Sequence, residues 1–250
     1  MRSYYLLKLL IFSILLNLFQ ALPAQVVINE YSVSNLSSFP DNHNKFEDWI
    51  ELYNSSQVPL DLSGWSLSDK ISDPLRWQFP EGTTIEPEGY IRVWASGRNE
   101  VSGSHFHTNF KLSQTKSEQE YIVFANPFGN IIDQHQLAIT QKEHSHGRVV
   151  DGGEQWGIFV NPTPKSSNQS STAYDGYTET PQMSPTAGFY NNPITVEIFT
   201  EEPDLTIRYT VNGSEPGPSS SVYADPLEID QTTIINARAF SDDPDILPGL

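Results

Sequence analysis

The sequence contains no cysteine, so no disulfide can staple any part of it. Small exported domains often rely on such bridges because their cores are too small to hold them folded. An exported chain without cysteine must be stabilised by packing and hydrogen bonds alone. This favours a bacterial protein over a small eukaryotic secreted module.

Basic residues are also scarce. The chain has 14 Lys and Arg against 31 Asp and Glu, which gives a formal net charge of −17. An acidic surface repels phosphate backbones and lacks the counterion release that drives non-specific nucleic-acid binding. We therefore expect no nucleic-acid partner and no attraction to an anionic membrane surface.

Helical periodicity and common enzyme motifs are missing as well. After the N-terminal segment no long stretch repeats apolar residues at helical spacing, and 18 Pro and 15 Gly separate short apolar runs. This pattern predicts an all-β protein. No Walker loop, dinucleotide fingerprint or G-x-S-x-G elbow occurs, so the corresponding nucleotide-binding and hydrolase sites are not expected.

The first 24 residues have the layout of a secretory signal peptide. Arg2 and Lys8 flank a polar start, an apolar run covers Leu9 to Phe19, and "QALPAQ" follows. We predict cleavage after Ala24 and a secreted or cell-surface location. A retained anchor is the alternative, but the run is shorter than the roughly 20 residues that span a bilayer and Asn17 interrupts it. No membrane insertion is expected after cleavage.

A Ser/Thr/Pro-rich stretch divides the remainder, from Thr163 to Pro185. Its composition cannot bury much apolar surface and is typical of a linker. The predicted organisation is a signal peptide, a first β-sandwich, a linker and a second β-sandwich at residues 1–24, 25–168, 169–180 and 181–250. The final "DDPDILPGL" has no closing apolar run, so we expect the second sandwich to be truncated and the natural protein to continue.

Short motifs spread over Val26 to Asn168 resemble the lamin-tail domain in its bacterial, secreted form. They are "VVINEY", "DWIELYN", "VPLDLSGWSLSD", "RWQFPEGTTIEPEGYIRVWAS", "HTNFKLS", "FGNIID", "SHGR" and "NPTPKSSN". The stretch after "FKLS" lacks the usual glycine, and His146 stands where the family more often has an aromatic. The resemblance implies an immunoglobulin-like β-sandwich.

The second segment, from Pro181 to Leu250, is similar to the C-terminal domain of chitobiase and β-hexosaminidases. The motifs are "MSPTAGFYNNPITVEI", "TIRYTVNGSEP", "SVYADPLEI" and "TTIINARAF". That family is also an immunoglobulin-like sandwich, and we expect its last strand to be absent from this sequence. Proteins that join these two modules are often large secreted bacterial proteins.

Together the resemblances imply a non-catalytic extracellular binding, targeting or spacer region of a larger secreted or surface protein. Its partner would be an extracellular protein or a polysaccharide. The alternatives are a carbohydrate-binding accessory of a secreted hydrolase, and the N-terminal part of a secreted kinase-like enzyme of the spore-coat protein H type. In the last case the catalytic domain would follow residue 250.

The stretch "DWIELYN" is the strongest candidate for chemistry. In a strand, Ile50 and Leu52 share one face and Glu51 the other, so Asp48 and Glu51 point apart and cannot form a glycosidase pair. Glu30 could approach either acid from a neighbouring strand. There are then two roles for the three acids Glu30, Asp48 and Glu51. They either hold loops in place by accepting hydrogen bonds from backbone N–H groups, which we favour, or share a cation such as Ca²⁺. We assign no catalytic and no cofactor-binding residue.

Other polar clusters favour structural roles. "DNHNKFED" is rich in oxygen ligands but breaks the EF-hand pattern, and "DGGE" is typical of a hairpin turn. His105 with His107 and His144 with His146 could hold Zn²⁺ only with a third ligand. Arg76 and Arg148 are expected to form structural ion pairs. The five tryptophans are expected mainly in the core, with a sugar-stacking platform as the alternative.

Overall fold

A computed structural model describes residues 25–249. The predicted signal peptide, residues 1–24, and Leu250 lie outside the described residues. Within 25–249 the chain is all-β, with strands β1 to β22, one short 3-10 helix at Asn168–Ser170 and no α-helix. The predicted fold class is confirmed. The described part has no helix that is long and apolar enough to cross a membrane.

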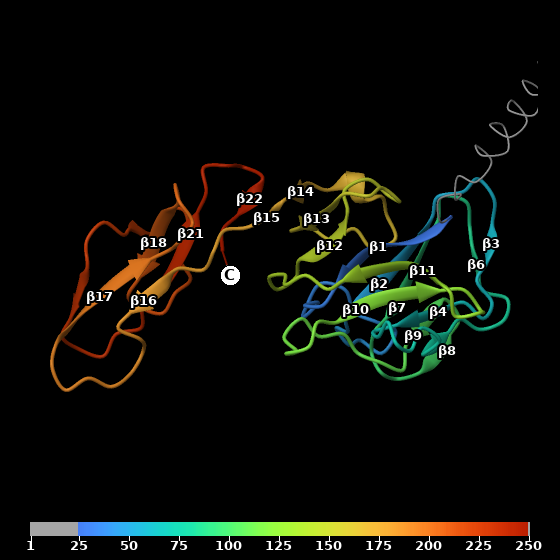
Figure 1. Cartoon of the computed structure of the whole chain (residues 1–250), viewed down its shortest axis with the longest axis horizontal. Helices are drawn as coiled ribbons and strands as arrows, with labels where there is room; N and C mark the ends of the chain where they lie inside the picture. The colour runs from blue at the N-terminus through green and yellow to red at the C-terminus, as the bar shows by residue number, and fades with distance from the viewer. Residues whose placement is uncertain (1–24, 250) are drawn as a thin grey trace, which may run out of the picture.

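Figure 1 shows two β-structured bodies, which we name by their strands. The first module contains β1 to β14. Its larger sheet has eight strands in the order β14-β13-β12-β1-β2-β7-β9-β8, and its smaller sheet has the order β11-β10-β4-β5. The eight strands of the larger sheet are β14 (Ala173–Tyr174), β13 (Trp156–Phe159), β12 (Ser145–Arg148), β1 (Val26–Ser32), β2 (Trp49–Asn54), β7 (Tyr90–Trp94), β9 (His105–His107) and β8 (Glu100–Ser102).

The smaller sheet lies against the larger one. Its strands are β11 (Ile131–Gln136), β10 (Tyr121–Ala125), β4 (Ser66–Ser68) and β5 (Trp77–Gln78), and a separate pair joins β3 (Leu60–Asp61) to β6 (Thr84–Ile85). Ile50 and Leu52 of β2 are fully buried in one apolar cluster with Ile122 and Phe124 of β10. The expected alternation in "DWIELYN" therefore places the two aliphatic side chains in the core.

The second module is a smaller sandwich of two three-stranded sheets, in the orders β16-β17-β20 and β19-β18-β21. These strands are β16 (Gln182–Ser184), β17 (Ile194–Phe199), β18 (Thr206–Thr210), β19 (Ser221–Val222), β20 (Leu227–Ile229) and β21 (Asn236–Phe240). Its buried apolar side chains are Val196, Ile198 and Ala239, so the core of this module is thin compared with that of the first.

The stretch for which composition predicts a linker carries strand pairing in the structure. β14 extends the large sheet of the first module by pairing with β13. β15 (Gly176–Tyr177) then pairs in parallel with β22 (Ile246–Leu247), close to the end of the described chain. The backbone groups of this stretch thus find partners by joining existing strands, which composition alone does not reveal.

Hydrogen bonds between side chains and the rest of the chain fix the junction between the modules. Gln141 of the first module donates from Nε2 to the carbonyl oxygen of Pro248 at 2.8 Å. Arg238 of β21 donates to the Gln141 Oε1 at 3.0 Å. The Tyr177 hydroxyl lies 2.7 Å from Nδ1 of His144, and the two rings are stacked. Hydrogen bonds and a ring contact therefore join the two modules.

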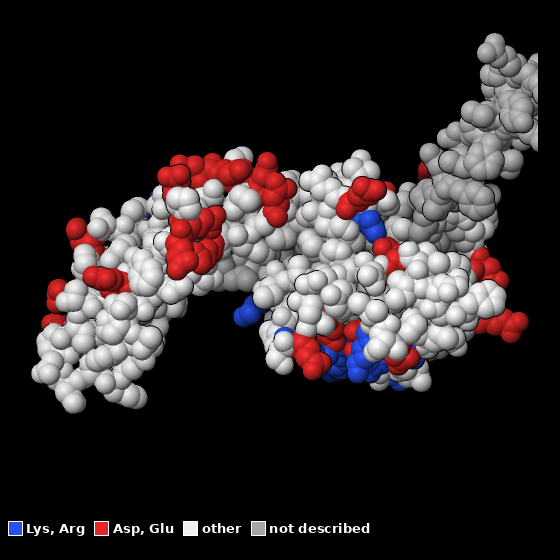
Figure 2. All heavy atoms as spheres, viewed as in Figure 1, with Lys and Arg blue, Asp and Glu red and all other residues white. Residues whose placement is uncertain are grey.

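Acidic side chains are spread along both modules, as Figure 2 shows for one face. Several basic side chains in the first module lie beside acids. Arg98 pairs with Asp41 and with Glu47, and Lys111 pairs with Glu47 at 3.1 Å. The excess of acid over base is thus partly compensated in the first module by local ion pairs, which are worth little individually where they are exposed.

Candidate functional site

The pairing of β1 with β2 brings two of the three candidate acids together. Glu30 stands opposite Glu51, and the register shifts between Ile28 and Glu30. This bulge leaves Ile28 and Tyr31 both in the core, although they are three residues apart, and turns Glu30 to the opposite face. Both carboxyl groups are fully buried. The sequence suggests this approach, but the bulge that permits it was not predicted.

Glu30 accepts several hydrogen bonds from the chain segment that follows β13. The backbone N–H and the hydroxyl of Thr163 both donate to it, each at 3.0 Å, and the Ser145 hydroxyl donates at 2.5 Å. Burial nevertheless raises the pKa of Glu30 to about 7, because the loss of water disfavours the charged form more than these bonds favour it.

Glu51 accepts fewer hydrogen bonds than Glu30. One oxygen, Oε2, accepts the backbone N–H of Lys165, and the other, Oε1, is buried with no hydrogen-bond partner in the described chain. Burial raises the pKa of Glu51 well above its usual range, and the neighbouring charge of Glu30 raises it further. Two carboxyl groups on neighbouring strands do not both ionise readily, so the pair retains a proton over a wide pH range.

Asp48 lies apart from this pair. It precedes β2, and its backbone carbonyl accepts the N–H of Ala95 at 2.8 Å. Burial raises the pKa of Asp48 to about 7, with a further rise from Glu47 and a smaller lowering from Lys111. The charges that act on its pKa are those of Glu47, Lys111 and Glu120 rather than Glu30 or Glu51, so Asp48 is not a member of the acid pair.

The hydrogen bonds of Glu30 and Glu51 hold a neighbouring chain segment in place. Thr163 and Lys165 belong to a segment that crosses the face of the large sheet, and its backbone N–H groups end on the two carboxyl groups. Within residues 25–249 no three side chains of His, Asp or Glu converge as metal ligands do. The arrangement therefore supports anchoring of a loop better than it supports acid–base chemistry.

Asp151 is a third acid in this region, and sequence reasoning placed it only in a hairpin turn. The turn between β12 and β13 is present, with Gly153 donating to the carbonyl of Val150 at 2.7 Å. In addition Asp151 accepts from the Asn29 side chain at 2.9 Å, the Tyr90 hydroxyl at 2.8 Å and the Asn168 backbone at 3.1 Å. No local pattern reveals these partners, since they come from distant strands and loops.

The histidines do not group as their spacing in the sequence indicates. His146 of β12 lies 3.3 Å from His135 of β11 and 3.0 Å from the Tyr31 hydroxyl, whereas His144 contacts Tyr177. Burial lowers the pKa of His146 to about 4 and that of His135 to about 3, the latter helped by the nearby charges. His107 is fully buried and contacts Ser96 and Asn42. These imidazoles are neutral groups of the interior.

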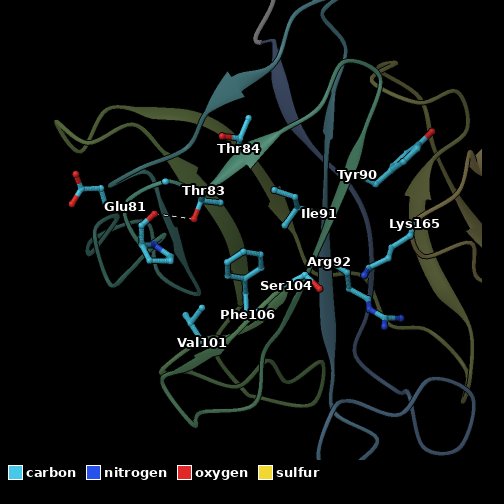
Figure 3. Close-up of a pocket in the computed structure, with 13 residues that line it drawn as sticks. Glu81, Thr83, Thr84, Tyr90, Ile91, Arg92, Val101, Ser104, Phe106 and Lys165 are labelled. Atoms are coloured by element: carbon cyan, nitrogen blue, oxygen red, sulfur yellow. Dashed lines mark hydrogen bonds between the residues drawn. The ribbon is translucent and has the colours of Figure 1, made fainter.

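A cavity of about 520 Å³ opens on the first module (Figure 3). Residues of the loop before β6, of β7 and of the β8–β9 turn surround it, together with Lys165. Its wall includes Arg92, whose strand position is directly opposite Glu51 in the β2–β7 register. A second cavity of about 520 Å³ lies in the second module, between the Pro185–Pro193 loop and the β20–β21 connection.

The comparison with protein families identifies the two modules. Residues 20–138 match the family model of the Lamin Tail Domain, and residues 185–245 match that of the Chitobiase/beta-hexosaminidase C-terminal domain. The first module therefore matches a lamin tail domain and the second a chitobiase-type domain, and we name the two modules accordingly. Their identity and order confirm the resemblance found in the sequence. No curated protein matches the chain.

The lamin tail domain extends beyond the matched range in the structure. Strands β12, β13 and β14 follow residue 138 and add to the same eight-stranded sheet. They also supply Ser145, and the segment after β13 supplies Thr163, which are the partners of Glu30. Both matched domains are immunoglobulin-like accessory modules rather than catalytic ones.

The tryptophans of the lamin tail domain form no exposed platform. Trp49, Trp77 and Trp94 are buried, and Trp65 and Trp156 are half-buried against the core. Core packing is therefore the role that the structure gives them. The two arginines expected in ion pairs do form them, Arg76 with Asp69 at 2.5 Å and Arg148 with Asp133 at 2.9 Å.

Proposed function

We propose that residues 25–250 form a non-catalytic, extracellular binding and spacer region of a larger secreted or cell-surface bacterial protein. The observation that carries the spacer role is the bonded junction between the modules. Gln141, Arg238 and Tyr177 connect them, and β15 and β22 are paired in parallel there. A chain with a fixed junction holds an attached domain at a set distance, whereas a flexible linker gives a broad range of distances.

Removal of the junction bonds should make the distance between the modules variable. Because the chain has no cysteine, Ser117→Cys and Ser219→Cys introduce two unique sites for spin labels, one exposed on each module. Double electron–electron resonance should give one narrow distance distribution. In the same background, Gln141→Ala combined with Tyr177→Phe should broaden it, because both substitutions remove hydrogen bonds of the junction.

Gln57→Ala is the matched control, since Gln57 bonds only to Glu88 on the surface of the first module. It should leave the distribution narrow. A distribution as broad in the parent as in the junction variant would contradict the spacer role, and it would leave a binding role of the separate modules untouched.

A carbohydrate-binding accessory role is a second candidate, and a specific observation favours it. Phe189 and Tyr190 lie next to each other in an exposed loop of the chitobiase-type domain, with Phe189 fully exposed and Tyr190 45% exposed. Both line the second cavity, together with the side chains of Asn191, Asn192 and Asp230. Exposed aromatic faces beside amide and carboxylate groups are typical of sugar recognition.

Retention on insoluble polysaccharide tests this candidate. We expect the chain to be retained on at least one of cellulose, chitin and peptidoglycan, and Phe189→Ala with Tyr190→Ala to lower retention by about tenfold, the effect of losing about 1.4 kcal/mol. Phe128→Ala removes an aromatic of the first module that is also largely exposed, and it serves as the control. Equal retention of all three proteins would argue against a role for this loop.

A further inference from the structure

Two cationic side chains that form no ion pair within residues 25–249 line the cavity of the lamin tail domain. Arg92 and Lys165 both border it, and in Figure 3 they lie on the same side of Ile91, Val101 and Phe106. In the described chain neither side chain forms an ion pair. Such pairs do occupy Arg76, Arg98, Arg148 and Arg238. Other cations of the described residues, such as Lys70 and Arg208, also lack an ion pair, but only Arg92 and Lys165 border this cavity together.

The guanidinium of Arg92 is held in place by an aromatic ring, but one of its hydrogen-bond donors has no acceptor among the described residues. Its guanidinium lies over the ring of Trp94, at 4.2 Å from the ring centroid, which fixes the plane of the group. The Nε atom is buried and has no hydrogen-bond partner in the described chain. Glu51 is the cross-strand neighbour, and its charge partly offsets the lowering of the Arg92 pKa by burial, but the two side chains form no ion pair.

Lys165 is placed by the same acid pair. Its backbone has a positive φ of 67°, a conformation that is rare outside glycine and needs support. That support comes from Glu51, which accepts the Lys165 backbone N–H. The buried carboxyl group therefore sets the position of the backbone from which the exposed lysine side chain reaches the cavity.

The remaining wall suits a sugar ring. Ile91, Val101 and Phe106 give it an apolar part, and the hydroxyl groups of Thr84 and Ser104 have no hydrogen-bond partner within residues 25–249. A volume of about 520 Å³ lies in the usual range for small-molecule sites. Glu81 also lines the cavity, on the side that Figure 3 shows away from Arg92 and Lys165.

We propose that this cavity binds an acidic sugar of an extracellular polysaccharide, with its carboxylate or sulfate ester on Arg92 and Lys165. An arginine fork and a lysine point charge together match an oxyanion, and such bonds are stronger than neutral ones. Ile91 and Arg92 are consecutive in β7 and point to opposite faces, and β7 pairs with β9 only from Val93 onward. The sugar would therefore lie across this edge of β7, with its ring toward Ile91 and its hydroxyl groups toward Thr84 and Ser104. The proposal rests on the binding role given above and assigns it a site and a ligand class.

The net charge of the chain does not oppose such a contact at physiological salt. The screening length is about 8 Å there, so acids elsewhere on the surface are largely screened from a group inside the cavity. A peptide carboxylate has the same charge, but the free hydroxyl groups of the wall favour a polyhydroxylated ring over a peptide side chain.

Isothermal titration calorimetry with defined oligosaccharides tests the proposal on the whole chain at 150 mM NaCl. Trigalacturonate should bind, and its methyl ester, which has the same rings without the charge, should bind at least tenfold more weakly. Lys165→Met and Arg92→Gln should each weaken trigalacturonate binding by tenfold or more. Lys70→Met, which removes an exposed lysine without an ion pair, should leave it unchanged.

A sulfated galactose trisaccharide forms the second arm and shows which oxyanion the site prefers; binding of either acidic sugar supports the proposal. Because Lys165 is exposed, its substitution leaves the fold intact, and melting curves verify this for each variant. No binding of either sugar, equal binding to the Lys165→Met variant, or tighter binding of a peptide with a free C-terminal carboxylate would overturn the proposal. A narrow distance distribution in the spin-label experiment would still leave the spacer role standing.

Discussion

Replacement of Arg148 by methionine will lower the free energy of unfolding of the lamin tail domain by about 3–5 kcal/mol, the range for breaking one side of a buried ion pair. Arg148 donates to the carbonyl oxygens of Ile28 and Gly153 and to the carboxylate of Asp133. The side chains of Arg148 and Asp133 are only 11% and 15% exposed, so solvent cannot replace the lost partner. Methionine keeps much of the volume and supplies no donor.

The reason for the large effect is that this one side chain connects both layers of the sandwich. Arg148 lies on β12 in the large sheet and Asp133 on β11 in the small one. Asp133 also accepts the backbone N–H of Ile28 at 2.8 Å. Loss of the arginine therefore leaves a partly buried carboxylate with a single remaining donor.

Thermal and urea unfolding measure this effect. With a module of about 150 residues, the midpoint should fall by roughly 2–4 °C for each kcal/mol. Lys111→Met breaks a pair with Glu47 in which the lysine is 64% exposed, and it should cost less than about 1 kcal/mol. Adding Asp133→Asn to Arg148→Met should restore part of the loss, because it removes the unpaired charge. A loss below 1 kcal/mol for Arg148→Met would refute the bridging role.

The sequence predicts the strands of this protein better than it predicts their partners. The alternation of Ile50 and Leu52 with Glu51 follows from the two-residue period of a strand, and the structure agrees. The ion pair of Arg148 was expected, but Asp133 as its partner depends on the packing of two sheets. Such long-range contacts have no local pattern, and only the fold brings them together.

The sequence predicts only part of the candidate site, because the site also depends on long-range contacts. Proximity of Glu30 and Glu51 needs only adjacent antiparallel strands, which the sequence allows. The bulge at Asn29, by contrast, has no glycine or proline to mark it. The segment that covers the pair, from Thr163 onward, begins a stretch whose composition predicts a linker, so its role in satisfying buried carboxyl groups was missed. The side chains of Arg92 and Lys165 were not singled out either, because lone cations on a strand and in a loop carry no motif.

The hydrogen bonds around Glu30 indicate that its protonated form fits the folded protein. The single hydroxyl hydrogen of Thr163 faces two acceptors, Oε2 of Glu30 at 3.0 Å and Oδ1 of Asn168 at 2.9 Å. The Asn168 amide is oriented by its donation to the carbonyl of Arg148 at 2.7 Å, so its oxygen must point toward Thr163. A proton on Oε2 of Glu30 can be donated to the Thr163 hydroxyl, which then donates to Asn168.

Glu30→Gln should therefore stabilise the protein above neutral pH by about 3 kcal/mol, since one pKa unit corresponds to about 1.36 kcal/mol. The folded pKa of about 7 lies above the usual 4.5. A raised pKa means that the carboxyl group's contribution is fully present below about pH 4.5 and is lost as the pH rises through about 7. Glutamine places an N–H donor where the acid proton would be and cannot ionise, so the variant should not show this loss.

Urea unfolding between pH 4 and pH 9 measures the difference between variant and parent, in which the titrations of Asp48, His135 and His146 cancel because both proteins contain them. Glu118→Gln, at an exposed position, should shift the stability by less than about 0.5 kcal/mol at every pH. Repeating the series with Ca²⁺ and with EGTA separates a shared proton from a shared cation. If the acid pair bound calcium, the metal would stabilise the parent and not the glutamine variant; a parent indifferent to calcium whose stability falls between pH 4.5 and 7 has a buried proton as the third member of the pair.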